Sequence, residues 1–151
     1  MVESLDPEKV GSVEVMATCK PTVVTRDQSM ARILVVDDSP TIRKMMIASL
    51  RGLEGVVIEE AGSGLEAVER LALAPVDMLF LDLNMPDIHG VEVIEFVRGH
   101  SSYAALPICV VTTRGDEASK MLAMNAGANV YITKPFSPHE LAEQANKLLP
   151  Q

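Results

Sequence analysis

Residues 77–82 read Asp-Met-Leu-Phe-Leu-Asp, and residues 83–87, Leu-Asn-Met-Pro-Asp, follow them. A continuous apolar run bounded by turn residues is typical of a strand buried on both faces, as in parallel α/β sheets. Such a strand delivers its last residue to the carboxyl edge of the sheet, where ligands bind in open α/β folds. Taken alone, Asp82 is better explained as the start of a turn, so its role depends on the rest of the chain.

The composition indicates a full hydrophobic core beneath an acidic surface. Hydrophobic residues make up 48% of the 151 residues, and the net charge is −8. This length suits one domain with an appendage. So acidic a chain lacks the positive surface of a nucleic-acid-binding protein. No apolar run approaches the roughly 20 residues that span a bilayer. We therefore expect neither nucleic acid nor a membrane as a partner.

The cysteines and the N-terminus indicate the compartment. Cys19 and Cys109 fit no metal or disulfide spacing. The first residues are acidic and lack the basic and apolar regions of a signal peptide. We expect a reduced, cytoplasmic protein.

Residues 1–29 differ from the rest of the chain. They mix proline, glycine, serine, threonine and scattered charges without a sustained period. We interpret them as a flexible N-terminal tail, and residues 30–151 as the folded domain. Met30 directly precedes the first strong strand, so a mis-assigned start codon would also explain the tail, and a docking role is a further alternative.

From Arg32 onward, strand-like and helix-like segments alternate. The expected strands cover residues 33–36, 56–58, 77–82, 108–112 and 129–133, and the expected helices cover residues 40–51, 63–71, 90–98, 116–125 and 138–149. This alternation predicts an α/β fold of the flavodoxin-like kind, with a five-stranded parallel sheet flanked by five helices. Right-handed crossovers place all strand ends on one edge. The order 2-1-3-4-5 is favoured, although the sequence does not determine it.

Two helices carry local signals. The helix expected over residues 40–51 has four apolar residues spaced as a buried stripe, namely Ile42, Met45, Met46 and Leu50. Ser39 or Asp38 can cap this helix. In the next helix, Ser63 and Glu66 have the spacing of a capping box.

Reactive side chains follow four of the expected strands. They are Asp37 and Asp38, Asp82, Thr112 and Lys134. Each has a simple explanation as a helix cap, a local turn or a solvated charge. Because parallel strands end at the same edge of a sheet, we expect the five side chains to lie close together, which chance does not readily produce.

The chemistry of this group favours a metal ion and a phosphoryl group. Crowded carboxylates repel, so at least one pKa should rise, and a hard divalent cation relieves the repulsion. Mg²⁺, or Mn²⁺ as a substitute, takes oxygen ligands and uses few carboxylates. Asp38, Asp82 and the backbone carbonyl near Asn84 would suffice, with Asp37 holding a water.

The same group could activate Asp82 as a nucleophile. The cation and Lys134 would neutralise phosphoryl oxygens, and Thr112 could donate a hydrogen bond to one of them. Asp82 would keep a free carboxylate oxygen and could form an acyl phosphate. Positioning and charge neutralisation are most of what phosphoryl transfer requires.

Four segments resemble the receiver domain of two-component response regulators. They are residues 33–39 (Ile-Leu-Val-Val-Asp-Asp-Ser), 79–86 (Leu-Phe-Leu-Asp-Leu-Asn-Met-Pro), 110–112 (Val-Val-Thr) and 134–136 (Lys-Pro-Phe). The resemblance covers about residues 30–149 and is specific, because four motifs occur in the right order on the right elements.

The resemblance implies a role for each residue of the site. Asp82 would be the phospho-acceptor, and Asp37 and Asp38 the acidic pair that binds Mg²⁺. Thr112 would be the switch hydroxyl, Lys134 the phosphate-binding lysine and Tyr131 the switch aromatic. The Lys134–Pro135 bond is expected to be cis, which the sequence alone only permits.

The resemblance also implies partners. A histidine kinase or phosphotransfer protein would be the donor, and an unidentified protein target would bind a face formed by residues 116–125, 129–133 and 138–149. Side chains expected on or near that face are Lys120, Met121, Met124, Tyr131 and Ser137, with core packing as the alternative for the methionines. On the first helix, Ile42 and Met46 could contact the kinase, although core burial is again the default.

Some residues and properties stay open at this point. Asn84 and Arg114 flank the site and are expected to tune hydrolysis of the phosphoryl group, whereas His89, His100 and His139 are expected to be surface residues without metal spacing. We expect a stand-alone, chemotaxis-type single receiver, monomeric or dimerising on phosphorylation, that turns over no outside substrate and is therefore not an enzyme.

Three other functions were weighed. A phosphatase with an aspartyl nucleophile commonly has an aspartate two residues later, where this chain has Asn84. A flavodoxin-like cofactor binder would have a phosphate loop where Asp37 and Asp38 stand. A receiver that is never phosphorylated fits poorly with a complete set of site residues.

Overall fold

The strand that ends before Asp82 lies at the centre of the sheet. The structure, a computed structural model, describes residues 30–149, so the tail expected over residues 1–29 lies outside the described residues. Strand β4 (Met78–Leu81) pairs with β2 (Ala31–Val36) on one side and with β5 (Ile108–Thr112) on the other. All residues of β4 are buried, as the apolar run predicts.

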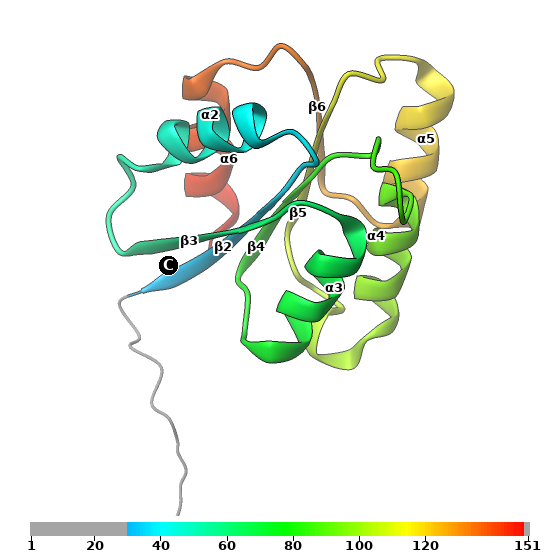
Figure 1. Cartoon of the computed structure of the whole chain (residues 1–151), viewed down its shortest axis with the longest axis horizontal. Coiled ribbons are helices and arrows are strands. Elements are labelled where there is room, and N and C mark those ends of the chain that lie inside the picture. Colours follow the sequence, from blue (N-terminus) through cyan, green and yellow to red (C-terminus); the bar gives the residue numbers. More distant parts are fainter. Residues whose placement is uncertain (1–29, 150–151) are drawn as a thin grey trace, which may run out of the picture. The chain divides into compact units, whose positions relative to one another are not determined.

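The sheet has the expected topology. Its order is β3-β2-β4-β5-β6, with β3 (Val56–Ala61) and β6 (Val130–Thr133) at the edges. Every pairing is parallel, so all five strands end at the same edge (Figure 1). In chain order this is 2-1-3-4-5, which confirms the predicted fold.

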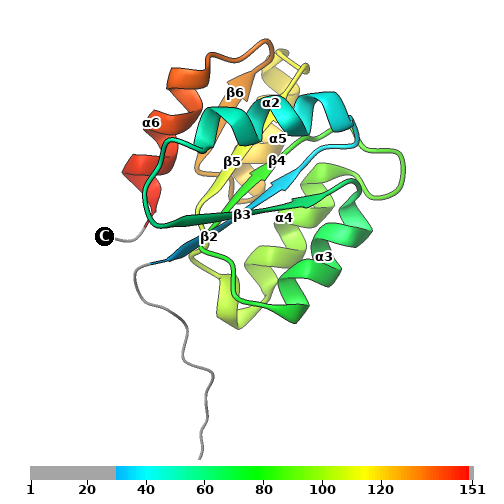
Figure 2. The same ribbon diagram turned by 60° about the vertical axis from the view of Figure 1, so that its left-hand side comes forward.

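Helices cover both faces of the sheet. Helices α2 (Pro40–Leu50) and α6 (Pro138–Leu148) lie on one face, and α3 (Gly64–Leu73), α4 (Gly90–Gly99) and α5 (Glu117–Ala126) lie on the other (Figures 1 and 2). A short 3₁₀ helix, η1 (Ser101–Tyr103), follows α4 and was not expected from the sequence. None of the helices within residues 30–149 combines the length and apolar character needed to cross a bilayer.

Strand β4 contributes to both hydrophobic cores. Leu79 and Leu81 belong to the core under α3, α4 and α5, and Met78 and Phe80 belong to the core under α2 and α6. All four side chains are fully buried. Burying a large apolar side chain contributes about 1.5–3 kcal/mol, so this strand fixes the position of Asp82 through packing on both faces.

Edge strand β3 is longer than predicted. It extends to Ala61, whereas the apolar residues end at Ile58. The two glutamates in the added part are paired with arginines: Arg32 with Glu59 at 3.0 Å and Arg43 with Glu60 at 2.9 Å. An edge strand tolerates charged side chains because one side of it faces solvent, which the apolar pattern does not reveal.

The expected stripe on α2 is wrong in one residue. Met46 and Leu50 are buried and Ile42 is half-buried, but Met45 is 50% exposed. Successive residues of a helix are rotated by about 100° around its axis. Met45 therefore lies about 100° around the helix from Met46, at the margin of the buried face, and half of it stays exposed.

Serine caps begin the helices that follow β2 and β3. Ser39, and not Asp38, caps α2, because its hydroxyl accepts a hydrogen bond from the Ile42 N–H at 3.3 Å. The Ser63 hydroxyl accepts from the Glu66 N–H at 3.1 Å. The reciprocal bond of the expected capping box is shifted by one residue, because the Glu66 carboxylate accepts from the Gly62 N–H at 2.8 Å.

Arg98 ties the end of α4 to the connection between α5 and β6. Its guanidinium donates to the Gly127 carbonyl at 2.8 and 3.0 Å, to the Tyr103 carbonyl at 3.2 Å and to Asn129 Oδ1 at 3.0 Å. Gly127 has φ of +124°, and a Cβ there would lie 2.8 Å from the Arg98 side chain. One side chain thus satisfies the carbonyls of two turns.

Replacing Arg98 by methionine should lower the free energy of unfolding by about 1–3 kcal/mol, because the Gly127 carbonyl loses both hydrogen bonds from the guanidinium and the Tyr103 carbonyl keeps only its bond from the Leu106 N–H. Arg70→Met is the matched control, since Arg70 makes only an exposed ion pair with Glu66 at 3.6 Å. The control should change stability by less than about 0.5 kcal/mol in urea unfolding. Equal effects of the two variants would contradict this account of Arg98.

Candidate functional site

Four strands bring reactive side chains to one edge of the sheet. Asp37 follows β2, Asp82 follows β4, Thr112 ends β5 and Lys134 follows β6. Asp37, Asp82 and Thr112 are 1%, 4% and 0% exposed. The residues singled out from the sequence at strand ends therefore meet in a largely buried group.

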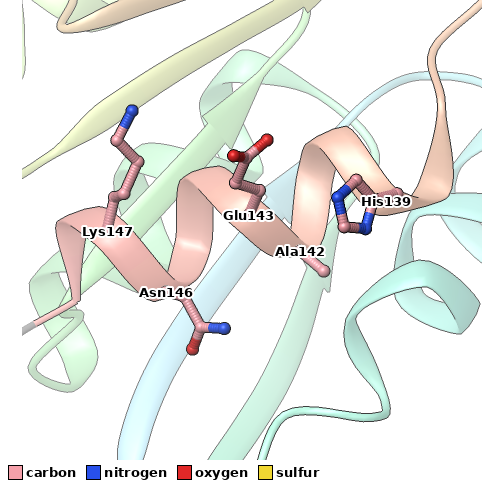
Figure 3. Close-up of a pocket in the computed structure, with 5 residues that line it drawn as sticks. All are labelled: His139, Ala142, Glu143, Asn146 and Lys147. Atoms are coloured by element: carbon pink, nitrogen blue, oxygen red, sulfur yellow. The ribbon is translucent and has the colours of Figure 1, made fainter.

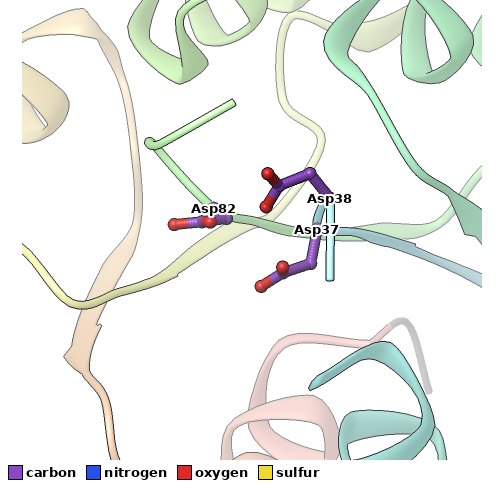
Figure 4. A group of neighbouring side chains, drawn as sticks. All are labelled: Asp37, Asp38 and Asp82. Atoms are coloured by element: carbon purple, nitrogen blue, oxygen red, sulfur yellow. The ribbon is translucent and has the colours of Figure 1, made fainter. Parts of the chain in front are cut away.

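Three carboxylates form an acidic group at this edge. One carboxylate oxygen from each of Asp37, Asp38 and Asp82 lies within 4.8 Å of the others (Figure 4). Mg²⁺ binds oxygen ligands at about 2.0–2.1 Å, so ligands on opposite sides of the ion lie about 4 Å apart. Asp38 is exposed, which leaves one side of the group open to solvent. The donor atoms and their spacing therefore suit a hard divalent cation.

Lys134 lies between two of the carboxylates. Its Nζ is 2.6 Å from Asp37 Oδ2 and 3.6 Å from Asp82 Oδ2. The backbone N–H of Lys134 donates to the Thr112 carbonyl at 2.7 Å, and the Lys134–Pro135 bond is cis as expected. Because backbone contacts fix the start of the side chain, the ammonium group is aimed at the acidic group.

The pKa of Asp82 is raised from its ordinary value of 3.8. Burial is the main cause, and the Asp37 charge adds to it. The Lys134 charge opposes the rise, as do hydrogen bonds from the Asn84 backbone N–H and the Thr112 hydroxyl. The ionised carboxylate of Asp82 is therefore held at a free-energy cost that a bound cation would reduce.

The turn after β2 is fixed by hydrogen bonds on both sides of Asp37. Its Oδ1 accepts from the Ser39 N–H at 2.9 Å, and its backbone carbonyl accepts from Arg43 Nη1 at 2.6 Å. Sequence reasoning missed Arg43. The signal available in the sequence was the spacing of Arg43, four residues after the cap Ser39. Residues four apart lie on the same side of a helix, so the Arg43 side chain can reach the loop before the cap.

Asn84 and Arg114 connect two loops at the rim of the site. Arg114 Nε donates to Asn84 Oδ1, and Asn84 Nδ2 donates to Thr113 Oγ1 at 3.1 Å. The Asn84 backbone N–H donates to Asp82 Oδ1 at 3.3 Å. The sequence placed these residues beside the site, but it gave no indication that they bond to each other.

Tyr131 lies beside the same loop. Its side chain is half-buried, and its hydroxyl donates to the backbone carbonyl of Arg114. Burial raises the pKa of the Tyr131 phenol. The aromatic ring thus contacts the loop that follows Thr112.

The surfaces expected to meet partners differ in exposure. Met121 and Met124 on α5 are 56% and 38% exposed, so core packing does not explain them. Met46 is buried, and only the half-buried Ile42 remains available on α2. An open pocket on α6 is lined by His139, Ala142, Glu143, Asn146 and Lys147 (Figure 3).

His89, His100 and His139 are exposed, as expected. Two of them also have a local structural contact. Nδ1 of His89 accepts from the Val91 N–H at the start of α4, and Nδ1 of His100 accepts from the Ser102 N–H at the start of η1, each at 3.3 Å.

Comparison with known proteins identifies the family. Residues 33–146 match the family model of the response regulator receiver domain, and this match spans most of the chain. The chain belongs to this family. It is therefore the receiver of a two-component system, which implies a phosphodonor and a downstream target.

Similar proteins place the chain among chemotaxis-type receivers. Chemotaxis protein CheY1 of Helicobacter pylori is 40% identical over 119 residues, which cover 78% of this chain and 96% of that protein. The structure of chemotaxis response regulator CheY4 of Vibrio cholerae matches with a TM-score of 0.73 and 35% identity, covering 80% of this chain and 99% of that one. A putative response regulator from Chloroflexus aurantiacus matches with a TM-score of 0.75 and 35% identity, covering 81% and 99%. The chain is a CheY-like response regulator, a phosphorelay signalling switch.

Asp82→Asn should raise the free energy of unfolding at neutral pH when a chelator is present. The reason is that the raised pKa of Asp82 makes its ionised form unfavourable in the folded state. Ionised Asp82 destabilises the folded state. This destabilisation is absent below the unfolded pKa of 3.8 and complete above the higher pKa of the folded state. The gain should therefore disappear as the pH is lowered to about 3 in a series of urea unfolding curves.

Asp116→Asn is the control for this measurement. Hydrogen bonds from Ser119 lower the pKa of Asp116, so its ionised form stabilises the folded state. Its replacement should lower stability at neutral pH. A loss of stability for Asp82→Asn at neutral pH would contradict the strain assigned to the buried carboxylate.

Proposed function

We propose that Asp82 accepts a phosphoryl group from the phosphohistidine of a histidine kinase or phosphotransfer protein, in a Mg²⁺-dependent reaction. The observation that carries this proposal is the position of Lys134 Nζ, 2.6 Å from Asp37 and 3.6 Å from Asp82. A cation beside a buried nucleophile can neutralise the oxygens of an incoming phosphoryl group.

The transfer exchanges one bond to phosphorus for another. An oxygen of Asp82 attacks the phosphorus atom, a P–O bond forms, and the P–N bond to the donor imidazole breaks. The leaving nitrogen keeps the electron pair and takes a proton from solvent. Lys134 stabilises the negative charge on the phosphoryl oxygens, and the Thr112 hydroxyl donates a hydrogen bond to one of them.

A divalent cation would be held by Asp37, Asp38, Asp82 and the backbone carbonyl of Asn84. When bound, Mg²⁺ (or Mn²⁺ in its place) supplies positive charge that offsets the repulsion between the carboxylates and the phosphoryl group. Support comes from the three carboxylates, which lie within 4.8 Å of one another, and from the raised pKa of Asp82.

The acyl phosphate is removed by water in the same site. Water attacks phosphorus and the bond to Asp82 breaks, which restores the carboxylate and releases phosphate. Asn84 and Arg114 are bonded to each other at the rim and tune the access of this water. The chain thus supports its own phosphorylation and dephosphorylation, and it turns over no outside substrate.

The phosphoryl group changes partner binding through the face formed by α5, β6 and α6. Thr112 moves toward the phosphoryl group, and Tyr131 follows because its hydroxyl is bonded to the loop after Thr112. Exposed Met121 and Met124 offer adaptable contacts on α5, and Lys120 and Ser137 lie at exposed positions of the same face. The pocket on α6 hollows the surface of a third element of this face.

The domain bounds, compartment, partners and oligomeric state that we propose follow from the same site. Residues 30–151 are assigned to the receiver domain, and residues 1–29 lie outside it. The receiver works in the cytoplasm with a protein donor and a protein target, without nucleic acid or membrane, as a monomer or as a dimer that forms on phosphorylation. The acidic net charge of −8 supports the exclusion of nucleic acid.

Incubation of the full chain with Mg²⁺ and acetyl phosphate should add the mass of one phosphoryl group. The reason is that a small phosphodonor needs only the nucleophile, the cation and Lys134. Intact mass spectrometry measures the product, and the added mass should be lost in Asp82→Asn and in the presence of a chelator. Lys134→Met should reduce the initial rate by about a hundredfold, the lower end of the range for removal of one transition-state contact.

The matched control is Lys44→Met, because Lys44 is an exposed lysine of α2 outside the acidic group. It should leave the rate unchanged. Label on another residue, or no label on the folded wild-type protein, would overturn the proposal.

Methionine methyl NMR tests the partner face. Phosphorylation of the full chain should shift the methyl signals of Met121 and Met124, because both lie on the helix that follows the Thr112 loop. Met45 on α2 is 50% exposed and provides the control signal, which should stay in place. A spectrum in which Met45 shifts and the two α5 methionines do not would place the change on another face.

A further inference from the structure

The connection from β4 to α4 carries Asp82 and Asn84, and Asp87 anchors it to another element. Asp87 Oδ1 accepts from the Gly64 N–H at 3.1 Å, and Oδ2 accepts from the Leu65 N–H at 2.9 Å. Gly64 and Leu65 are the first two residues of α3. Gly64 and Leu65 are 23 and 22 positions before Asp87, so this contact joins the β4–α4 connection to a helix that is distant in the sequence.

The chemistry of this contact is favourable to an anion. The first N–H groups of a helix lack partners within the helix, and the helix dipole adds positive potential there. Both oxygens of the Asp87 carboxylate are used. The hydrogen bond from Leu65 is the main cause that lowers the pKa of Asp87 to about 2, with further bonds from Ile88 and Gly64. The anchor is therefore ionised across the physiological range of pH.

Two glycines show how closely the connection is packed. A Cβ on Gly64 would lie 2.8 Å from the Ile88 Cβ. A Cβ on Gly90 would lie 2.6 Å from the Leu83 Cα and 2.7 Å from the Asp82 carbonyl oxygen. Only glycine allows these approaches without a shift of the connection. The β4–α4 connection is therefore packed against α3 at Gly64 and against its own first residues at Gly90.

The segment between the anchors has little freedom. The Asp82 N–H donates to the Val36 carbonyl at 3.0 Å, which fixes the start, and Asp87 fixes the end. Asn84 lies between these points, and Pro86 restricts the backbone just before the anchor. Asp87 thus sets the position of the Asn84 carbonyl relative to the three carboxylates together with the hydrogen bonds that Asn84 itself makes to Asp82, Thr113 and Arg114.

We propose that Asp87 is a positioning residue for the divalent cation: by holding the β4–α4 connection on the N-terminus of α3, it keeps the Asn84 carbonyl and Asp82 in the geometry that binds the ion. This inference rests on the proposed function. It adds a residue that touches neither the ion nor the phosphoryl group, and it makes the start of α3 a part of the support of the site.

The competing explanation is that Asp87 only stabilises α3. Ser63 separates the two explanations, because it also caps this helix, through the Glu66 N–H at 3.1 Å, and it precedes the helix on the β3 side. Ser63→Ala therefore weakens the start of α3 and leaves the anchor of the β4–α4 connection in place. Asp87→Ala removes the anchor.

The experiment measures Mg²⁺ binding to the full chain by isothermal titration calorimetry, together with urea unfolding in chelator. Asp87→Ala should raise the Mg²⁺ dissociation constant by about tenfold, the lower range for loss of a group that orients a metal ligand. Asp87→Asn keeps one of the two acceptor oxygens and should lie between the wild type and Asp87→Ala. Ser63→Ala should lower stability and leave the dissociation constant unchanged.

Each outcome decides a different question. Equal Mg²⁺ affinity in the wild type and Asp87→Ala would overturn the inference while the proposed function stands. An equal loss of affinity in Ser63→Ala and Asp87→Ala would also overturn it, because helix stability would then explain both. A folded wild-type protein that does not bind Mg²⁺ would instead refute the proposed function. Unfolding curves of each variant confirm that the comparison is made on folded protein.

Discussion

The attraction between the Lys134 ammonium and two nearly inaccessible carboxylates is the interaction on which the site depends. Transferring a charged group from water into a buried site costs free energy, and this cost is offset only when charged partners and hydrogen bonds are well placed. Here Asp37 takes the close contact with Lys134, at 2.6 Å, and Asp82 has the longer one, at 3.6 Å. Burial raises the pKa of Asp82, and the longer contact with Lys134 offsets this rise only in part, which suits a group that must react or bind a cation.

The hydrophobic core places this charged group, and polar contacts refine it. Packing of β4 on both faces sets the position of Asp82 along the sheet, because each of its side chains is fully buried. Beyond the strand ends, the β4–α4 connection still reaches the core through Leu83 and Met85, which are 1% and 9% exposed. Polar contacts add to this packing: Arg43 binds the Asp37 carbonyl, Arg114 binds Asn84, and both carboxylate oxygens of Asp87 bind the start of α3. The polar contacts of Arg43, Arg114 and Asp87 therefore refine the positions of loops that the core has already placed.

This division also explains what could be predicted from the sequence. The buried run in residues 78–81 and the position of Asp82 after it follow from local periodicity, and the meeting of Asp37, Asp82, Thr112 and Lys134 follows from parallel strands ending together. The burial expected for Met45 was wrong because residue spacing does not show how wide a face of α2 is covered by the neighbouring elements. The contacts of Arg114 and Asp87 could not be predicted, because each joins loops 22 to 30 residues apart whose geometry has no local signature.

The polar contacts between the loops at the edge of the site affect how this fold could switch between two conformations. A phosphoryl group shifts an equilibrium only as far as its contacts differ between the two states. If these loops were held rigidly by apolar packing, the protein would have one conformation, and the phosphoryl group could not make different contacts in a second one. In this chain the loop after Thr112 is held by polar contacts near the surface, Asn84 on one side and the hydroxyl of the half-buried Tyr131 on the other, and such contacts exchange with water at little cost. The buried sheet keeps the charges together, while the weak bonds at the rim leave the loop that joins the site to α5 free to adopt a second arrangement.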